Sequence, residues 1–140
     1  MRPLYAIAAF AGVRWGEIGR LRWEDVKEKE IVVRAVAAKT RSRRIVEISE
    51  NLQAFLRPPY KPPRSLERRR RRSEREAGLT PWRNNCLRHS FISYLFAISH
   101  DENKTAAMAG NSPAMVHRYY RALVSKEEAE RYWRIMPIAL

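Results

Sequence analysis

Cysteine is nearly absent from this sequence, since Cys86 is the only one among 140 residues. An intramolecular disulfide is therefore impossible, and a metal site built on pairs of thiolates is excluded. Long apolar runs are missing as well, because no uncharged stretch approaches the roughly 18 residues needed to cross a bilayer. We expect a soluble protein that suits a reducing cytosol and does not enter a membrane.

Acidic residues are also in short supply. Asp and Glu together number 15 against 28 Lys and Arg, which leaves a formal net charge of +13. The few carboxylates are not spaced as a magnesium site requires, so a metal-dependent nuclease is disfavoured. A charge excess of this size repels itself unless a polyanion or salt compensates it. Nucleic acid is therefore the leading partner, and no RNA-binding signature accompanies the charge.

The length suits one domain, residues 1–140, and the spacing of apolar side chains predicts several helices in it. Two helix starts carry capping signals, because Ser112 is followed by a proline and Ser125 stands three residues before Glu128. The expected helices span 3–10, about 14–21, 51–56, 85–98, 104–109, a segment after Pro113, and 125–133.

Two β-branched runs, 31–33 and 44–48, flank the polar stretch 39–43 and predict a hairpin with a basic tip. Beyond it, residues 57–80 combine four prolines with the arginine run 68–72. Prolines forbid regular structure, so we interpret 57–80 as a Pro/Arg-rich linker or insertion within the domain. Glutamates stand on both sides of the arginine run, which favours a solvated linker or an exposed helix for the basic part. The alternative is that these arginines bind backbone phosphates.

Residues 12–26, GVRWGEIGRLRWEDV, carry the first of four short motifs. The planar guanidinium of Arg14 can grip two phosphate oxygens, and Glu17, one helical turn later, can hold that side chain in place. This segment resembles the first arginine motif of the tyrosine recombinases, the family of the phage integrases, and Arg14 matches its first catalytic arginine. The alternative is that both residues are solvated charges on a helix surface.

Lys39 resembles the family's hairpin lysine, which reaches into the minor groove and protonates the leaving 5′ oxygen. An ammonium suits this step because it is mobile and can release a proton. The alternative is a turn lysine that only contacts DNA. We assign DNA contacts to the neighbouring Arg41, Arg43 and Arg44, and to Arg118.

Residues 85–91, NCLRHSF, resemble the family's second arginine motif. Arg88 matches the second catalytic arginine, and Asn85 stands where the family has a His three residues before it. Asn85 keeps a hydrogen-bond donor but offers no titratable group for proton transfer. We expect His89 to pack or cap within its own helix, as a supporting residue.

Residues 109–113, AGNSP, resemble the family's Leu-Gly-His-Ser motif, with Asn111 in place of the usual His or Trp. Asn111 can donate a hydrogen bond to a phosphate oxygen. In the family the nucleophilic tyrosine follows nine residues later, and this count leads to Tyr120. Successive helical residues point about 100° apart, so only one of Tyr119 and Tyr120 can face the phosphate. We predict that Tyr120 is the nucleophile.

These four motifs occur in the family's order over nearly the whole chain, which implies a tyrosine-recombinase catalytic domain. The implied fold is mainly α with a small antiparallel β-sheet. The implied activity is that of a site-specific DNA recombinase or integrase, which cleaves and rejoins double-stranded DNA through a 3′-phosphotyrosyl intermediate. Arg14 and Arg88 would stabilise the transition state with help from Asn85 and Asn111, and no metal, nucleotide or other cofactor is needed.

The resemblance also implies a homotetramer on DNA, in the cytoplasm of a prokaryote or in a phage-derived element, associated with the nucleoid. The chain begins almost at the first arginine motif, so we expect the family's N-terminal core-binding domain to be absent. Two alternatives stay open. A noncatalytic DNA-binding module, or an inactive truncated recombinase remnant, would keep its function in a Tyr120→Phe variant. A type IB topoisomerase shares the chemistry, but the short chain and the AGNSP motif disfavour it.

Overall fold

The computed structural model describes residues 1–39, 41–56 and 65–138, and most of its secondary structure is helical. Two strands, β1 (Glu30–Val33) and β2 (Arg44–Glu47), form one antiparallel sheet. The prediction of a mainly α-helical protein with a small antiparallel sheet is confirmed. The helices are α1 (Arg2–Phe10), α2 (Trp15–Ile18), the 3-10 turn η1 (Trp23–Asp25), α3 (Glu50–Phe55), α4 (Leu66–Glu76), α5 (Cys86–Ser99), α6 (Glu102–Ala109), α7 (Pro113–Tyr120) and α8 (Lys126–Trp133).

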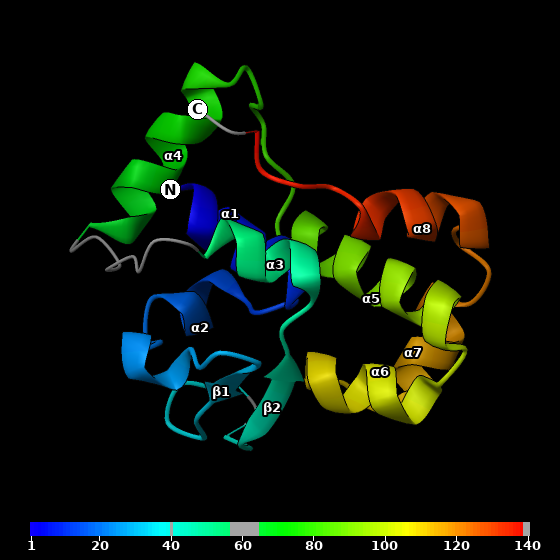
Figure 1. Ribbon diagram of the computed structural model, residues 1–140. Coiled ribbons are helices and arrows are strands. Elements are labelled where there is room, and N and C mark those ends of the chain that lie inside the picture. Colours follow the sequence, from blue (N-terminus) through cyan, green and yellow to red (C-terminus); the bar gives the residue numbers. More distant parts are fainter. Residues whose placement is uncertain (40, 57–64, 139–140) are drawn as a thin grey trace.

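The helix α5 is the element on which α1, α6, α7 and α8 all pack. In Figure 1 it runs from near the centre of the protein toward the right, with α8 above it and α6 and α7 below. Its buried Phe91 and Ile92 join Leu4 and Ile7 of α1 in a single apolar core. Burying one such side chain stabilises the fold by about 1.5–3 kcal/mol. The core therefore fixes the position of α5 relative to its neighbours.

The two strands form a hairpin that fixes the position of Arg44. Ile31 pairs with Val46 and Val33 with Arg44, so the expected hairpin over these two runs is confirmed. Side chains alternate along β2, and this buries Arg44 and Val46 while Ile45 lies on the exposed face. The strand β2 also packs against α6, which brings Arg44 to the C-terminal end of that helix.

The expected capping residues begin α7 and α8. The Ser112 hydroxyl accepts a hydrogen bond from the Met115 backbone N–H at 3.3 Å. Ser125 and Glu128 form a reciprocal capping box, with bonds of 3.1 and 2.8 Å. The helix α2 is shorter than expected, because it ends at Ile18 and leaves Leu21 in the following turn. Glycine at positions 16 and 19 gives this segment a low helix propensity.

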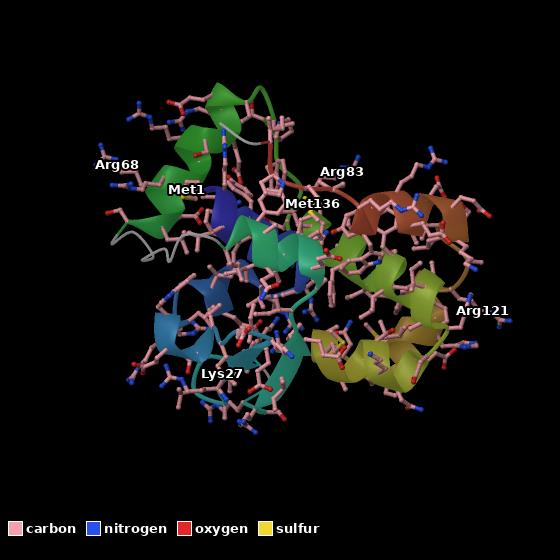
Figure 2. The ribbon with its side chains drawn as sticks, viewed as in Figure 1. Met1, Lys27, Arg68, Arg83, Arg121 and Met136 are labelled. Carbon is pink, nitrogen blue, oxygen red and sulfur yellow. The ribbon has the colours of Figure 1, made fainter. Side chains whose placement is uncertain are left out.

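The basic part of the segment 57–80 folds as α4. Its four prolines, Pro58, Pro59, Pro62 and Pro63, lie outside the described residues. Within α4, ion pairs at helical spacing join arginines to Glu67, Glu74 and Glu76. The helix also contacts α1, since the Tyr5 hydroxyl donates a 3.3 Å hydrogen bond to the carbonyl of Arg70. The arginine run is therefore helical and attached to the core, while side chains such as Arg68 point away from the protein (Figure 2).

Replacing Gly12 by Ala should destabilise the protein by about 2–5 kcal/mol. Gly12 has a φ of +60°, and a Cβ there would collide with the buried Phe91 ring. The left-handed backbone costs about 1–2 kcal/mol and the overpacking about 1–3 kcal/mol more. Gly78 is the matched control, since its φ is +68° and nothing lies within 4 Å of its Cβ position. Urea denaturation should show the smaller loss for Gly78→Ala, and equal losses would contradict this packing.

Candidate functional site

A buried carboxylate, Glu17, joins two arginines. Its side chain has no exposed surface. Arg44 grips both carboxylate oxygens, with Nη2 2.6 Å from Oε2 and Nη1 3.2 Å from Oε1. Arg14 donates from Nη1 to Oε1 at 3.1 Å and from its backbone N–H to Oε2 at 3.0 Å. Burial by itself raises the pKa of Glu17, but the hydrogen bonds and charges of Arg44 and Arg14 lower it to about 2. Glu17 is therefore ionised at neutral pH, and it is not a solvated surface charge.

The location of Arg44 corrects the expectation that it contacts DNA. Arg44 is only 8% exposed, and its Nε donates to the carbonyl of Met108 at 3.0 Å. Its remaining bonds go to Glu17, so the guanidinium is held inside the protein. The alternation of side chains along β2 places Arg44 on the same inward face as Val46. Arg44 thus connects the hairpin, α2 and the end of α6.

The two arginines expected to bind phosphate lie on either side of the loop after α6. Arg14 remains one-fifth exposed, and its Nη2 donates to the carbonyl of Gly110 at 3.5 Å. Arg88 is buried and donates to the Gly12 carbonyl at 2.7 Å and to Asn111 Oδ1 at 2.8 Å. Because Asn111 accepts through its oxygen, its amide N–H groups stay available as donors.

Positive charge is concentrated at this point. Burial, together with the charges of Arg14 and Arg44, lowers the pKa of Arg88 to about 10, so Arg88 remains protonated at neutral pH. Two guanidinium groups bond to the ionised Glu17, and the nearby Arg88 has no carboxylate bonded to it among the described residues. This arrangement leaves an excess of positive charge, which favours the binding of an anion such as phosphate.

A groove of about 780 Å³ opens beside these groups, and Arg14, Lys39, Arg43 and Asn111 are among the residues that line it. Lys39 is exposed, and its backbone N–H lies 3.4 Å from Glu17 Oε1. Asn85 lies with Arg14 and Lys39 around an adjoining pocket of about 370 Å³. The structure thus brings the predicted Arg14, Lys39, Asn85 and Asn111 to one surface.

Tyr120 is the buried member of the tyrosine pair at the end of α7. It is 8% exposed, whereas Tyr119 is 50% exposed and stacks with the guanidinium of Arg118. Burial raises the pKa of Tyr120 above its ordinary value, although the charges of Arg88 and Arg14 oppose this rise. The phenol therefore stays protonated at neutral pH.

His89 contacts Tyr120, which corrects the expectation that it packs or caps within α5. The Nδ1 atom of His89 lies 2.6 Å from the Tyr120 hydroxyl, and the two rings stack with centroids 5.8 Å apart. This contact joins α5 to α7. The sequence offered one indirect signal, because position 89 lies one helical turn after Asn85, where the family carries its His.

The remaining expected DNA contacts, Arg41, Arg43 and Arg118, are exposed. Other basic side chains are spread over the surface, as Lys27, Arg83 and Arg121 show in Figure 2. Exposed arginines can reach a phosphate backbone without loss of internal contacts, unlike Arg44.

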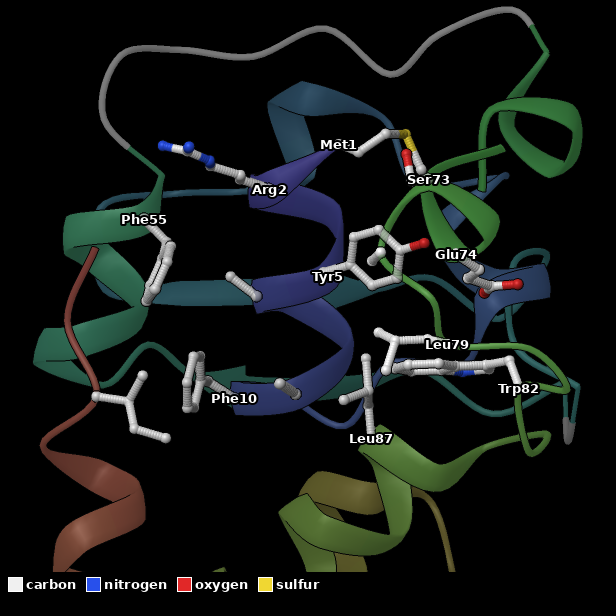
Figure 3. A pocket seen from close by; sticks show the side chains of 14 residues that line it. Met1, Arg2, Tyr5, Phe10, Phe55, Ser73, Glu74, Leu79, Trp82 and Leu87 are labelled. Atoms are coloured by element: carbon white, nitrogen blue, oxygen red, sulfur yellow. The ribbon is translucent and has the colours of Figure 1, made fainter. Parts of the chain in front are cut away.

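A second cavity, of about 470 Å³, is almost entirely apolar (Figure 3). Tyr5 and Trp82 meet edge to face on one side of α1, and Phe10 and Phe55 stack on the other. Glu74 lies at its border and is bound to Arg70. This cavity lacks the convergent charged groups of the groove, so we place the functional site at the groove.

Comparison with protein-family models, with curated proteins and with solved structures gives no match. Within residues 1–39, 41–56 and 65–138, no three His, Cys, Asp or Glu side chains gather so that they could hold a metal ion. No helix in the same described ranges is long and apolar enough to cross a membrane. Function therefore has to be inferred from the side chains of the site and their geometry.

Replacing Glu17 by Gln should destabilise the protein by about 3–5 kcal/mol at pH 7, because the buried Arg44 guanidinium loses its counter-charge. The pKa of Glu17 is about 2 in the folded protein, below the ordinary 4.5. Its contribution to stability is therefore complete above about pH 4.5 and is lost as the pH falls toward 2. Urea denaturation from pH 7 to pH 2 should show a flatter pH dependence for the variant than for the wild type.

Glu67→Gln is the matched control for that measurement. Hydrogen bonds from Arg70 and Arg71 also lower the pKa of Glu67 to about 2, but Glu67 lies on the surface of α4. Exposed ion pairs contribute about 0–1 kcal/mol. Equal destabilisation by the two substitutions would contradict a structural role for the buried carboxylate.

Proposed function

We propose that this chain is the DNA-cleaving domain of a tyrosine site-specific recombinase, with Tyr120 as the nucleophile. The observation that carries the proposal is that Arg14 and Arg88 both bond to the loop at residues 110–111, while the residue after Arg88, His89, contacts the Tyr120 hydroxyl. These arginines come from the two motifs that resemble the family's arginine motifs. Their convergence on the loop that leads into α7, the helix that carries Tyr120, is a tertiary arrangement that neither motif contains by itself, and it supports the family's chemistry.

Phosphoryl transfer without a metal needs cations on the nonbridging oxygens, a nucleophile in line and an acid for the leaving oxygen. In the proposed cleavage, the Tyr120 oxygen attacks the scissile phosphorus and forms a 3′-phosphotyrosyl ester. Arg14 and Arg88 stabilise the charge that develops on the phosphate, together with the amides of Asn85 and Asn111. Lys39, exposed on the same groove, donates a proton to the leaving 5′ oxygen.

Religation reverses these steps with a 5′ hydroxyl from another strand. One ester replaces another of similar energy, so the reaction needs no nucleotide or other cofactor. Arg41, Arg43 and Arg118 contribute to holding double-stranded DNA over the groove in this proposal, while Arg44 supports the site from inside. Exchange between two DNA sites would take place in a tetramer of such domains.

Trapping of a covalent complex tests the proposal. Incubation with nicked suicide DNA substrates in EDTA should give a denaturation-resistant protein–DNA adduct. Tyr120→Phe should abolish the adduct, because a benzene ring has no nucleophilic oxygen, whereas Tyr119→Phe should retain it. DNA binding without an adduct on any substrate would favour the noncatalytic DNA-binding module. Relaxation of supercoils without exchange between sites would favour a topoisomerase.

The salt dependence of DNA affinity tests the assigned contacts. Each phosphate neutralised by an arginine adds about 0.9 to the slope of log affinity against log salt. Arg43→Ala should lower this slope by about one and weaken binding to all duplex sequences to a similar extent. Arg72→Ala is the matched control, since Arg72 is exposed on α4 and pairs with Glu76. An unchanged slope in Arg43→Ala would contradict a phosphate contact at the hairpin tip.

A further inference from the structure

Asn85 stands where the family has a His, so the four motifs assign no residue that accepts the proton of the nucleophile. The contact between His89 and Tyr120 provides one. We propose that His89 accepts the phenolic proton of Tyr120 during DNA cleavage and returns it during religation. The amide of Asn85 cannot perform this step, because it does not titrate. This inference rests on the proposed function and adds a catalytic residue to it.

The geometry suits direct proton transfer. The Nδ1 atom of His89 lies 2.6 Å from the hydroxyl oxygen of Tyr120, within the range that general-base catalysis requires. The two rings are inclined by only 22°, which keeps the hydroxyl beside the imidazole. A neutral imidazole that carries its hydrogen on Nε2 can accept the phenolic hydrogen at Nδ1.

Two adjacent residues of α5, Arg88 and His89, have different roles in the proposed reaction. Arg88 is buried and extends to Gly12 and Asn111, beside the proposed phosphate site. His89 is exposed and extends to the Tyr120 hydroxyl on α7. An exposed imidazolium can exchange its proton with water, whereas the buried phenol has less access. His89 therefore connects the buried nucleophile to solvent.

Asn85 does not take the place of His89 as a contact of the phenol. Asn85 precedes α5 as its N-cap residue and lines a pocket with Arg14 and Lys39. In the described part of the chain, no hydrogen bond joins Asn85 to Tyr120. Asn85 is therefore placed to contact the phosphate or the leaving strand, and the base for the nucleophile lies one helical turn further along α5.

Burial of the phenol makes a base useful, because it opposes the loss of the phenolic proton. Burial raises the pKa of Tyr120, while Arg88 of α5 and Arg14 before α2 lower it. Among the residues that the structure describes, no carboxylate bonds to His89 or Tyr120. Glu17 is bound to Arg44 and Arg14, and the other histidine near Tyr120 on α7, His117, pairs with Glu102 of α6 at 2.6 Å.

The proposed step balances in protons and bonds. As the bond between the Tyr120 oxygen and phosphorus forms, the phenolic proton moves to His89 Nδ1, and the bond from phosphorus to the 5′ oxygen breaks. The leaving oxygen takes a proton from Lys39. In religation the incoming 5′ hydroxyl gives its proton back to Lys39, and the imidazolium of His89 protonates the departing Tyr120 oxygen.

The test compares the pH profile of adduct formation in wild type and His89→Asn on a suicide DNA substrate. Asn can keep a hydrogen-bond acceptor near the Nδ1 position but cannot accept a proton at neutral pH. The wild-type rate should rise with pH, because only a deprotonated base can accept the phenolic proton. His89→Asn should retain DNA affinity and form the adduct about 10²–10³-fold more slowly. Its rate of adduct formation should no longer rise with pH. His100→Asn is the control and should match the wild type, since His100 stands at the far end of α5 in a left-handed conformation that Asn tolerates.

Chemical rescue provides a second readout that a purely structural role would not produce. Free imidazole should accelerate adduct formation by His89→Ala, in proportion to its neutral form, because position 89 is exposed. A wild-type rate and pH profile in His89→Asn, with the Tyr120 adduct still formed, would overturn the role of His89 and leave the nucleophile intact. Failure of imidazole to rescue a folded, DNA-binding His89→Ala would also overturn it. Absence of any adduct in the wild type would overturn the proposed function and this inference together.

Discussion

The buried ion pair between Glu17 and Arg44 is the interaction on which the site depends. It ties the hairpin to α2, and through the bond from Arg44 to the Met108 carbonyl it also ties both to the end of α6. The same carboxylate holds Arg14. Burying two charges costs free energy that the pair itself only partly returns, so its main effect is to specify one arrangement of these elements. With Glu17 neutralised, Arg14 would lose its orientation and Arg44 would be left as an uncompensated buried charge.

A second set of contacts, made by α5, completes the site. Arg88 reaches across to Gly12 and Asn111, and this fixes the loop after α6 against the segment before α2. His89 holds the end of α7 through Tyr120. One turn of α5 thus positions both the Arg88 guanidinium and the Tyr120 phenol. Rigid placement of this kind is what the proposed reaction needs, because it relies on positioning and electrostatics.

Local patterns were enough to predict much of the fold. Apolar spacing indicated α5, capping residues indicated the starts of α7 and α8, and β-branched runs indicated the hairpin. The argument that adjacent helical residues face different directions also predicted that Tyr119 and Tyr120 would differ, and their exposures of 50% and 8% agree. These features are set by neighbours in sequence, which is why the sequence reveals them.

Contacts between distant elements were harder to predict. Arg44 was assigned to DNA because it belongs to a run of basic residues, although its two-residue spacing from the buried Val46 was a signal that it points inward. The contact between His89 and Tyr120 depends on how α5 and α7 cross, and no spacing within either helix encodes it. The attachment of α4 to α1 through Tyr5 is likewise a product of packing.

Mass spectrometry of the covalent complex tests the central claim most directly. Nuclease treatment followed by trypsin should leave the short peptide Tyr119–Arg121, since trypsin cleaves after Arg118 and Arg121. The account predicts that this peptide carries a nucleotide joined through its 3′ phosphate, and that fragmentation places the modification on Tyr120. A nucleotide on Tyr119 or on any other residue, or a linkage through a 5′ phosphate, would contradict the account.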